Sequence, residues 1–118
     1  MKGYFILVLF SFFATLAFTQ SHQVVREELY SNGRVKLQFV EVTKTLVKAT
    51  YFHDNGMVSE TGYYLNEKLY GYWETFDFSE NKIASGFFEN NEKTGDWNYW
   101  KDGELIQVIS YSNSIAVN

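Results

Sequence analysis

The stretch that decides the fold is GYYLNEKLYGYWETF, residues 62–76, and it recurs 24 positions later as GFFENNEKTGDWNYW, residues 86–100. Both stretches have a first glycine, a second glycine nine residues later and a tryptophan two residues after that. Self-similarity at a fixed period is typical of repeat architectures, in which each unit is one supersecondary element. The sequence therefore predicts tandem structural units of about 24 residues.

Turn signals divide the chain into short segments that suit β-strands. Asn32-Gly33, Asn55-Gly56 and Asp102-Gly103 are dipeptides that supply positive φ at hairpin turns. The segments between the turns are rich in Tyr, Phe, Trp, Val and Thr, which favour a half-buried pleated surface. We expect strands at 24–30, 35–43, 46–53, 57–65, 70–77, 82–89, 95–101 and 104–111. Consecutive hairpins predict an all-β antiparallel meander, that is, an elongated twisted sheet of tandem β-hairpins.

The repeated pattern of glycine, aromatic residue, polar turn, Gly-x-Trp and second aromatic residue resembles the MORN-repeat variant family of small, often secreted bacterial proteins. The matching residues are Gly62, Tyr64, Asn66, Gly71, Trp73 and Phe76, and then Gly86, Phe88, Asn90, Gly95, Trp97 and Trp100. Lys68 and Glu92 depart from the pattern, because a turn glycine is common there. The resemblance implies β-hairpin repeats used for binding, assembly or membrane association. Some similar proteins carry bacterial antitoxin-type names, and others carry a nicotinate-nucleotide adenylyltransferase name.

The N-terminus has the features of a secretory signal peptide. Lys2 precedes an apolar run over residues 4–18, which spans about 22 Å as a helix, less than the roughly 30 Å hydrocarbon core. Ala17 and Thr19 are small residues at the −3 and −1 positions of a cleavage site after Thr19. An uncleaved anchor is the alternative. We expect a signal peptide at 1–19, capping strands at 20–46, the repeats at 47–111 and a tail at 112–118 without regular structure.

Composition excludes several function classes. The 118 residues have 10 Lys+Arg against 14 Asp+Glu, so a net charge of −4 offers no footprint for nucleic acid and little attraction to anionic membranes. With no cysteine and only His22 and His53, the chain lacks the ligands of a zinc site. An adenylyltransferase of the kind named above needs a paired-histidine motif on an α/β core, which is absent. We therefore expect no cofactor, no metal and no catalytic residue.

The aromatic residues are the main candidates for binding. Successive residues of a strand point to opposite faces, so neighbouring rings cannot all share one core, and rings that gather on an exposed face mark a binding surface. The sequence does not fix the face of each ring, and the repeat-equivalent tryptophans favour the core. The candidate set is Tyr63, Tyr70, Tyr72, Trp73, Trp97, Tyr99 and Trp100. The repeated glycines are expected to be structural, through positive φ or close approach beneath a ring: Gly62, Gly71, Gly86 and Gly95.

These observations predict an exported, non-catalytic protein that binds another envelope or extracellular protein, by its aromatic face or by adding a strand at an open sheet edge. An antitoxin-like role belongs to this class. Binding of a carbohydrate or the cell wall through exposed rings is the alternative. Catalysis ranks last: His53-Asp54 lies at a turn, and strand carboxylates such as Glu60 and Glu74 are expected on solvated faces.

Overall fold

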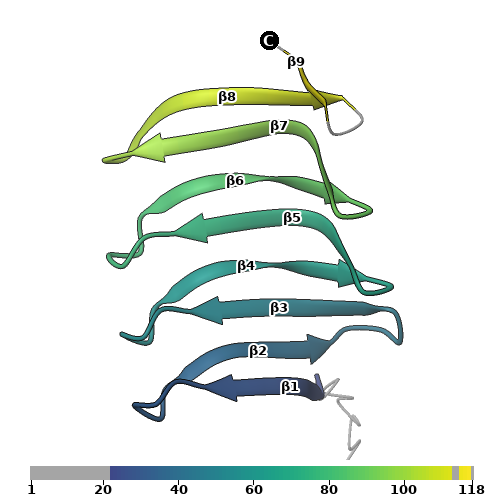
Figure 1. Ribbon diagram of the computed structural model, residues 1–118, viewed down its shortest axis with the longest axis vertical. Coiled ribbons are helices and arrows are strands. Elements are labelled where there is room, and N and C mark those ends of the chain that lie inside the picture. Colours follow the sequence, from purple (N-terminus) through teal and green to yellow (C-terminus); the bar gives the residue numbers. More distant parts are fainter. Residues whose placement is uncertain (1–21, 113–114, 118) are drawn as a thin grey trace, which may run out of the picture.

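The computed structural model describes residues 22–112 and 115–117, so the predicted signal peptide lies outside the described residues. The described chain forms one antiparallel sheet in which the strands lie side by side in sequence order (Figure 1). The all-β hairpin meander predicted from the sequence is confirmed. Its strands are β1 (Val24–Leu29), β2 (Val35–Glu41), β3 (Leu46–Phe52), β4 (Val58–Leu65), β5 (Lys68–Phe76), β6 (Lys82–Glu89), β7 (Glu92–Lys101), β8 (Glu104–Ser112) and β9 (Ile115–Val117).

Besides shifts of one or two residues at other strand ends, the starts of β5 and β7 and the C-terminal tail differ from the sequence prediction. β5 and β7 begin at Lys68 and Glu92, not at 70 and 95, because the preceding turns contain only two residues. Both residues of each turn, Asn66-Glu67 and Asn90-Asn91, have positive φ, as a tight hairpin turn requires. Glycine is thus dispensable at these turns, since Asn tolerates the left-handed region. The predicted irregular tail also needs correction, because β9 pairs with residues 110–112 of β8.

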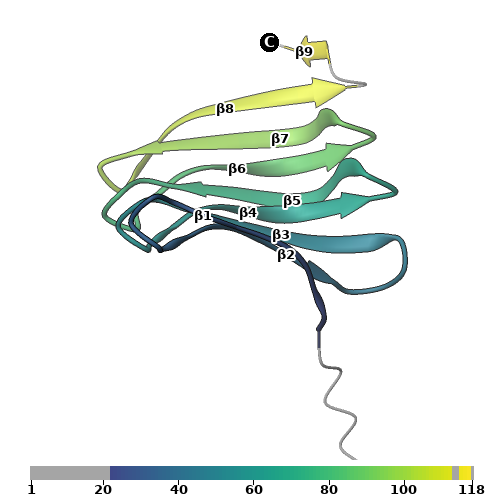
Figure 2. The ribbon, with the colours of Figure 1, turned by 60° about the horizontal axis from the view of Figure 1, so that its bottom comes forward.

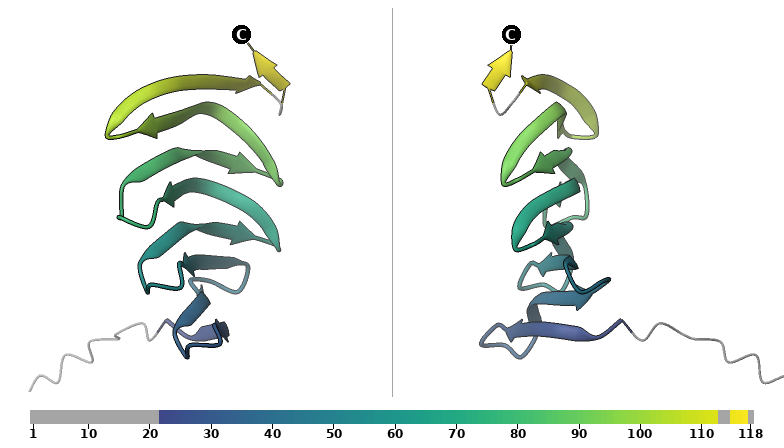
Figure 3. Two further views of the ribbon diagram at one scale, coloured as in Figure 1. Left: turned by 60° about the vertical axis from the view of Figure 1, so that its left-hand side comes forward. Right: turned by 90° about the vertical axis from the view of Figure 1, so that its right-hand side faces the viewer.

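A large bulge bends each repeat hairpin. Between β4 and β5 the pairing passes from Thr61 with Glu74 to Tyr63 with Tyr70, so Gly62 lies opposite three residues. Gly86 has the same place between β6 and β7. The second repeat glycines, Gly71 and Gly95, have φ of 72° and 67°, a conformation that favours glycine. Bulges bend strands, and the strands are arched in the same sense in Figure 3.

The repeat tryptophans lie over the first repeat glycines. A methyl group on Gly62 would overlap the indole of Trp73, and one on Gly86 would overlap the indole of Trp97. The two indoles are only 3% and 5% exposed. Trp73 Nε1 donates to the carbonyls of Tyr63 and Tyr70, and Trp97 Nε1 donates to that of Phe87 at 3.0 Å. Each ring therefore fills the space left by a missing side chain and satisfies its own N–H on the bulged backbone.

The β2–β3 hairpin, here called the first hairpin because it precedes the two repeat hairpins β4–β5 and β6–β7, reverses this arrangement of large and small residues. Ala49 stands 24 residues before Trp73, at the tryptophan position, and is fully buried. Its partner across the hairpin is Phe39 rather than a glycine, and the β2–β3 register is regular. At the other end, Trp97 pairs with Ile109 on β8. The contact of an indole with a glycine therefore occurs twice in the described chain. The first hairpin also pairs a large residue with a small one, but with the two on exchanged strands.

One face of the sheet, here called the ring face, carries the core. Its ring contacts run from Phe39 to Tyr64, to Trp73, to Phe88 and to Trp97, with centroid separations of 5.5, 5.6, 5.7 and 4.9 Å. Three of the four contacts are edge-to-face, a preferred geometry for aromatic pairs. Because a single layer has no second sheet to cover it, its core is the cluster of these rings with Ala49 and the side chains packed against them.

Turn side chains connect successive hairpins on both sides of the sheet. In Figure 2 the hairpin turns lie in two rows, one on each side. In one row, Asn32 donates to the carbonyl of Asp54, and Asn55 donates to that of Phe78. In the other row, Asn91 Oδ1 accepts the backbone N–H of Leu69 at 2.8 Å. The polar turns that mark the repeat in the sequence therefore also hold one hairpin to the next.

We expect Gly62→Ala to destabilise the protein by about 2 kcal/mol, because the added methyl group forces the Trp73 indole out of its place. The neighbouring change Thr61→Ala is the matched control, since Thr61 lies on the opposite face, and should cost less than about 1 kcal/mol. Urea denaturation followed by tryptophan fluorescence measures both. Equal stability of Gly62→Ala and the wild type would contradict the packing described above.

Candidate functional site

The structure divides the seven aromatic candidates between the core and the two faces. Trp73 and Trp97 are buried beneath neighbouring rings and cannot form a contact surface. This corrects their place in the candidate binding set, and the physical reason is the glycine beneath each ring. Tyr99 also lies on the ring face, packed against the core. Trp100 is half-buried, with the ammonium of Lys82 at 5.6 Å from its ring centroid.

The remaining candidates lie together on the opposite face. Tyr63 pairs with Tyr70, and Tyr72 pairs with Phe87 at a ring separation of 5.3 Å. Tyr70, Tyr72 and Phe87 are 42%, 39% and 50% exposed. Tyr70 and Phe87 also border one shallow depression. These four residues form what we call the outer aromatic patch, of which the sequence predicted all but Phe87.

The outer edge of β8 is a second exposed apolar feature. Among the described residues, β9 pairs only with residues 110–112, which leaves the edge of residues 104–109 open. Leu105, Ile106 and Val108 are 54%, 59% and 48% exposed. The sequence analysis placed a strand here but did not single out its side chains. The sequence does contain an indication of this apolar edge, because residues 105–109, LIQVI, carry no charge.

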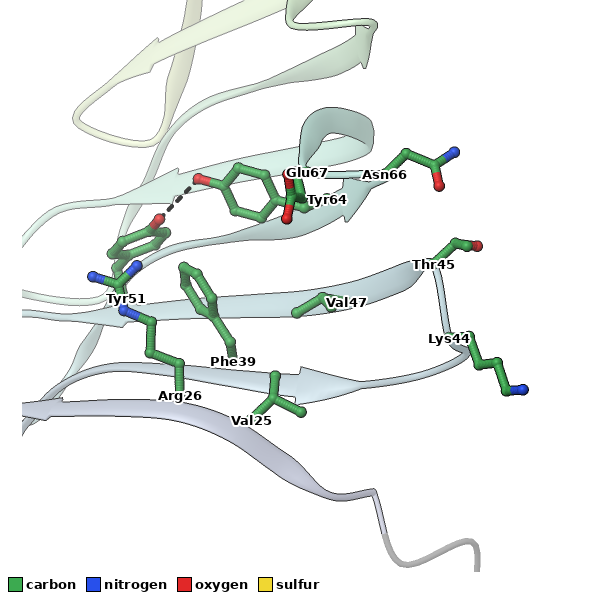
Figure 4. Close-up of a pocket in the computed structure, with 10 residues that line it drawn as sticks. All are labelled: Val25, Arg26, Phe39, Lys44, Thr45, Val47, Tyr51, Tyr64, Asn66 and Glu67. Atoms are coloured by element: carbon green, nitrogen blue, oxygen red, sulfur yellow. Dashed lines mark hydrogen bonds between the residues drawn. The ribbon is translucent and has the colours of Figure 1, made fainter.

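A hollow lies on the ring face of strands β1 to β4. It has a volume of about 760 Å³ and is drawn in Figure 4. The rings of Phe39, Tyr51 and Tyr64 form its floor, and the hydroxyls of the two tyrosines are 2.9 Å apart. Burial raises the pKa of Tyr51 well above its usual range, and the bond to Tyr64 adds to this. Tyr51 is therefore a neutral hydrogen-bonding group at every physiological pH.

Charged and polar groups surround this hollow on two sides. The guanidinium of Arg26, on β1, lies 5.4 Å from the centroid of Phe39 and is paired with Glu28 at 2.6 Å. Lys44, Asn66 and Glu67 lie at the other end, on the turns (Figure 4). The sequence analysis missed this site. The clue that could have found it is Ala49, which breaks the tryptophan spacing at its first position.

The residues considered for catalysis are separated or engaged in structural contacts. His53 stacks on Phe78 at 4.1 Å, and its Nε2 lies 2.9 Å from the carbonyl of Phe76. Glu74 is paired with Lys82 at 2.8 Å. Glu60 belongs to the ring face, opposite Tyr51, whereas Glu74 lies on the other face, so the two do not form a carboxylate pair. No cluster of three metal-binding side chains occurs among the residues that the structure describes.

Comparison with known proteins adds no further assignment: no protein-family model, curated protein or solved structure matches this chain. Within residues 22–112 and 115–117, no helix is long and apolar enough to cross a membrane. The site must therefore be judged on its own geometry.

Glu60, which pairs with Tyr51 across β3 and β4, gives the fold a testable pH dependence. Burial raises the pKa of this carboxyl in the folded state, so its ionised form costs stability. The contribution of the protonated Glu60 carboxyl to the free energy of unfolding is fully present below the pKa of the unfolded state, and it is lost as pH rises through the pKa of the folded state. We expect Glu60→Gln to raise the melting temperature at pH 7. At about pH 3 it should leave the melting temperature unchanged, because the Glu60 carboxyl is then protonated in both the folded and the unfolded state. Glu104→Gln, at an exposed position, is the control with the same charge change, and an equal gain from it would contradict the burial effect.

Proposed function

We propose that this chain is an exported, non-catalytic β-repeat protein that binds another envelope or extracellular protein through the open edge of β8. Membership of the MORN-repeat variant family is part of this proposal and rests on the 24-residue pattern. An assembly role and an antitoxin-like role are both forms of such binding. The observation that supports it most is an edge strand that, among the described residues, has no partner over residues 105–109 and carries no charge there.

Exposed strand edges offer unpaired N–H and C=O groups to any extended chain, and proteins commonly protect them with charges. The first strand follows this rule, because β1 contains Arg26, Glu27 and Glu28 within six residues. β8 does not, since Glu104 is its only charged residue. The edge of β8 therefore favours the addition of a strand with apolar residues at alternate positions.

The outer aromatic patch is a second feature that favours a protein partner. Tyrosine and phenylalanine are enriched where proteins meet. The rings of Tyr72 and Phe87 are tilted by 49° to each other, so they do not form a flat platform. Such a surface fits the side chains of a protein better than the flat face of a sugar ring.

The edge is tested by placing a charge on it. We expect Val108→Lys to abolish capture of the partner from an envelope extract of the producing cells, because a lysine on an edge strand blocks pairing. Val42→Lys is the matched control, since Val42 is an exposed valine in the loop after β2, away from the edge. Quantitative mass spectrometry compares what the immobilised wild type and both variants retain.

The expected result is one protein retained at near-equal ratio by the wild type and by Val42→Lys, and lost from Val108→Lys. Retention that is unaffected by Val108→Lys would show that the edge is not the binding surface. Retention of no protein at all by the wild type would contradict the proposed function itself. Circular dichroism of each variant confirms that the sheet is intact.

A further inference from the structure

On β7 and β8, a lysine side chain lies over three rings of the ring face. Lys93 Nζ lies 4.7 Å from the ring centroid of Trp97, 6.0 Å from that of Tyr99 and 5.6 Å from that of Tyr111. It also donates to the Tyr99 hydroxyl at 3.3 Å. The chain therefore covers these three rings with one of its own long side chains.

The first hairpin has corresponding rings, but here the long side chain, Arg26 of β1, lies over only one of them, Phe39. Tyr51 and Tyr99 each stand two residues after the tryptophan position, at Ala49 and Trp97. In the two repeat hairpins, Leu69 pairs with Tyr64 and Lys93 pairs with Phe88. At the corresponding position of the first hairpin, Val47 pairs with Glu41. Valine is shorter than leucine or lysine, whereas Phe39 supplies the ring that Ala49 lacks. The short Val47 side chain borders a hollow of about 760 Å³, which is in the size range of small-molecule sites.

The polar groups around the hollow differ from those of a purely apolar pocket. Thr45, Asn66 and Glu67 line it together with the two tyrosine hydroxyls, so several donors and acceptors border the ring floor. Such a set matches a ligand with many hydroxyl groups and one apolar face. A ligand that is apolar throughout would leave these groups unpaired, at a cost in affinity.

The charges at the hollow favour an acidic ligand over a cationic one. Arg26 already lies over Phe39, as Lys93 lies over Trp97, so the place of a cation is taken. The Arg26 side chain is 55% exposed, and its guanidinium has more N–H donors than Glu28 uses. Lys44 adds a second positive charge at the opposite end, and the carboxylates near these two charges are Glu67 and Glu28, the ion-pair partner of Arg26. An arginine and a lysine on either side of a ring floor suit a carboxylate-bearing ring.

We propose that the hollow lined by Phe39, Tyr51 and Tyr64 binds an acidic sugar residue, with the sugar ring on the aromatic floor and its carboxylate on Arg26. Lys44 acts as a second, longer-range partner for the carboxylate. This site lies on the opposite face from the outer aromatic patch and is independent of the β8 edge. It can therefore exist whether or not the edge binds a protein.

Titration of the purified protein with a galacturonic acid trisaccharide tests the site, with a neutral galactose trisaccharide of the same length as the comparison probe. Isothermal calorimetry gives the affinities, and ¹H–¹⁵N NMR spectra locate the contact. We expect the acidic probe to shift the amide signals of Val47, Tyr51 and Tyr64, and to bind at least tenfold more tightly than the neutral probe.

Arg26→Gln should weaken binding of the acidic probe about tenfold. Lys101→Gln removes the same charge at an exposed position near the β7–β8 turn and should leave the affinity unchanged. Thermal melting of both variants shows whether they are folded. Equal binding of both probes, equal weakening by the two variants, or no binding by the folded wild type would each overturn the proposal. None of these outcomes bears on partner capture by β8.

Discussion

The rest of the structure depends on the contact of an indole with a glycine. Trp73 can lie flat against the sheet only because Gly62 has no side chain, and the same is true of Trp97 and Gly86. The bulge that brings ring and glycine together also supplies carbonyl acceptors for the indole N–H. A single-layer sheet has no second layer to bury its apolar groups, so these interlocked rings serve as its core.

The candidate sites lie where this contact changes. In the first hairpin, Phe39 and Ala49 exchange the large and small positions, and the hollow on the ring face lies beside them. On β8, Ile109 stands where the repeat would require a glycine, and the neighbouring edge is open. The two regions differ in chemistry, since the hollow is bordered by charges and hydroxyls whereas the edge is apolar. The ends of a repeat array thus acquire properties that its middle lacks.

The sequence predicts the strands, the hairpin order and the structural role of the repeat glycines, because turn dipeptides and the 24-residue period are local signals. It does not predict the two-residue turns at Asn66 and Asn90, since the turn glycine that is common at positions 68 and 92 is absent and non-glycine residues adopt the positive φ. It also cannot assign faces to the rings: a bulge at Gly62 shifts three residues against one, and this depends on pairing between strands. The hollow is bordered by the short Val47 side chain, and only the assembled sheet shows it.

Hydrogen exchange of the three tryptophan indole N–H groups tests the central contact most directly. Two indoles, Trp73 and Trp97, are buried and donate to backbone carbonyls, whereas Trp100 is half-buried and has no acceptor among the described residues. NMR of protein labelled at the tryptophan nitrogen should show two indole protons that exchange as slowly as the most protected sheet amides, and one that exchanges rapidly. Rapid exchange of all three would mean that the indoles do not lie on their glycines, and would contradict the account.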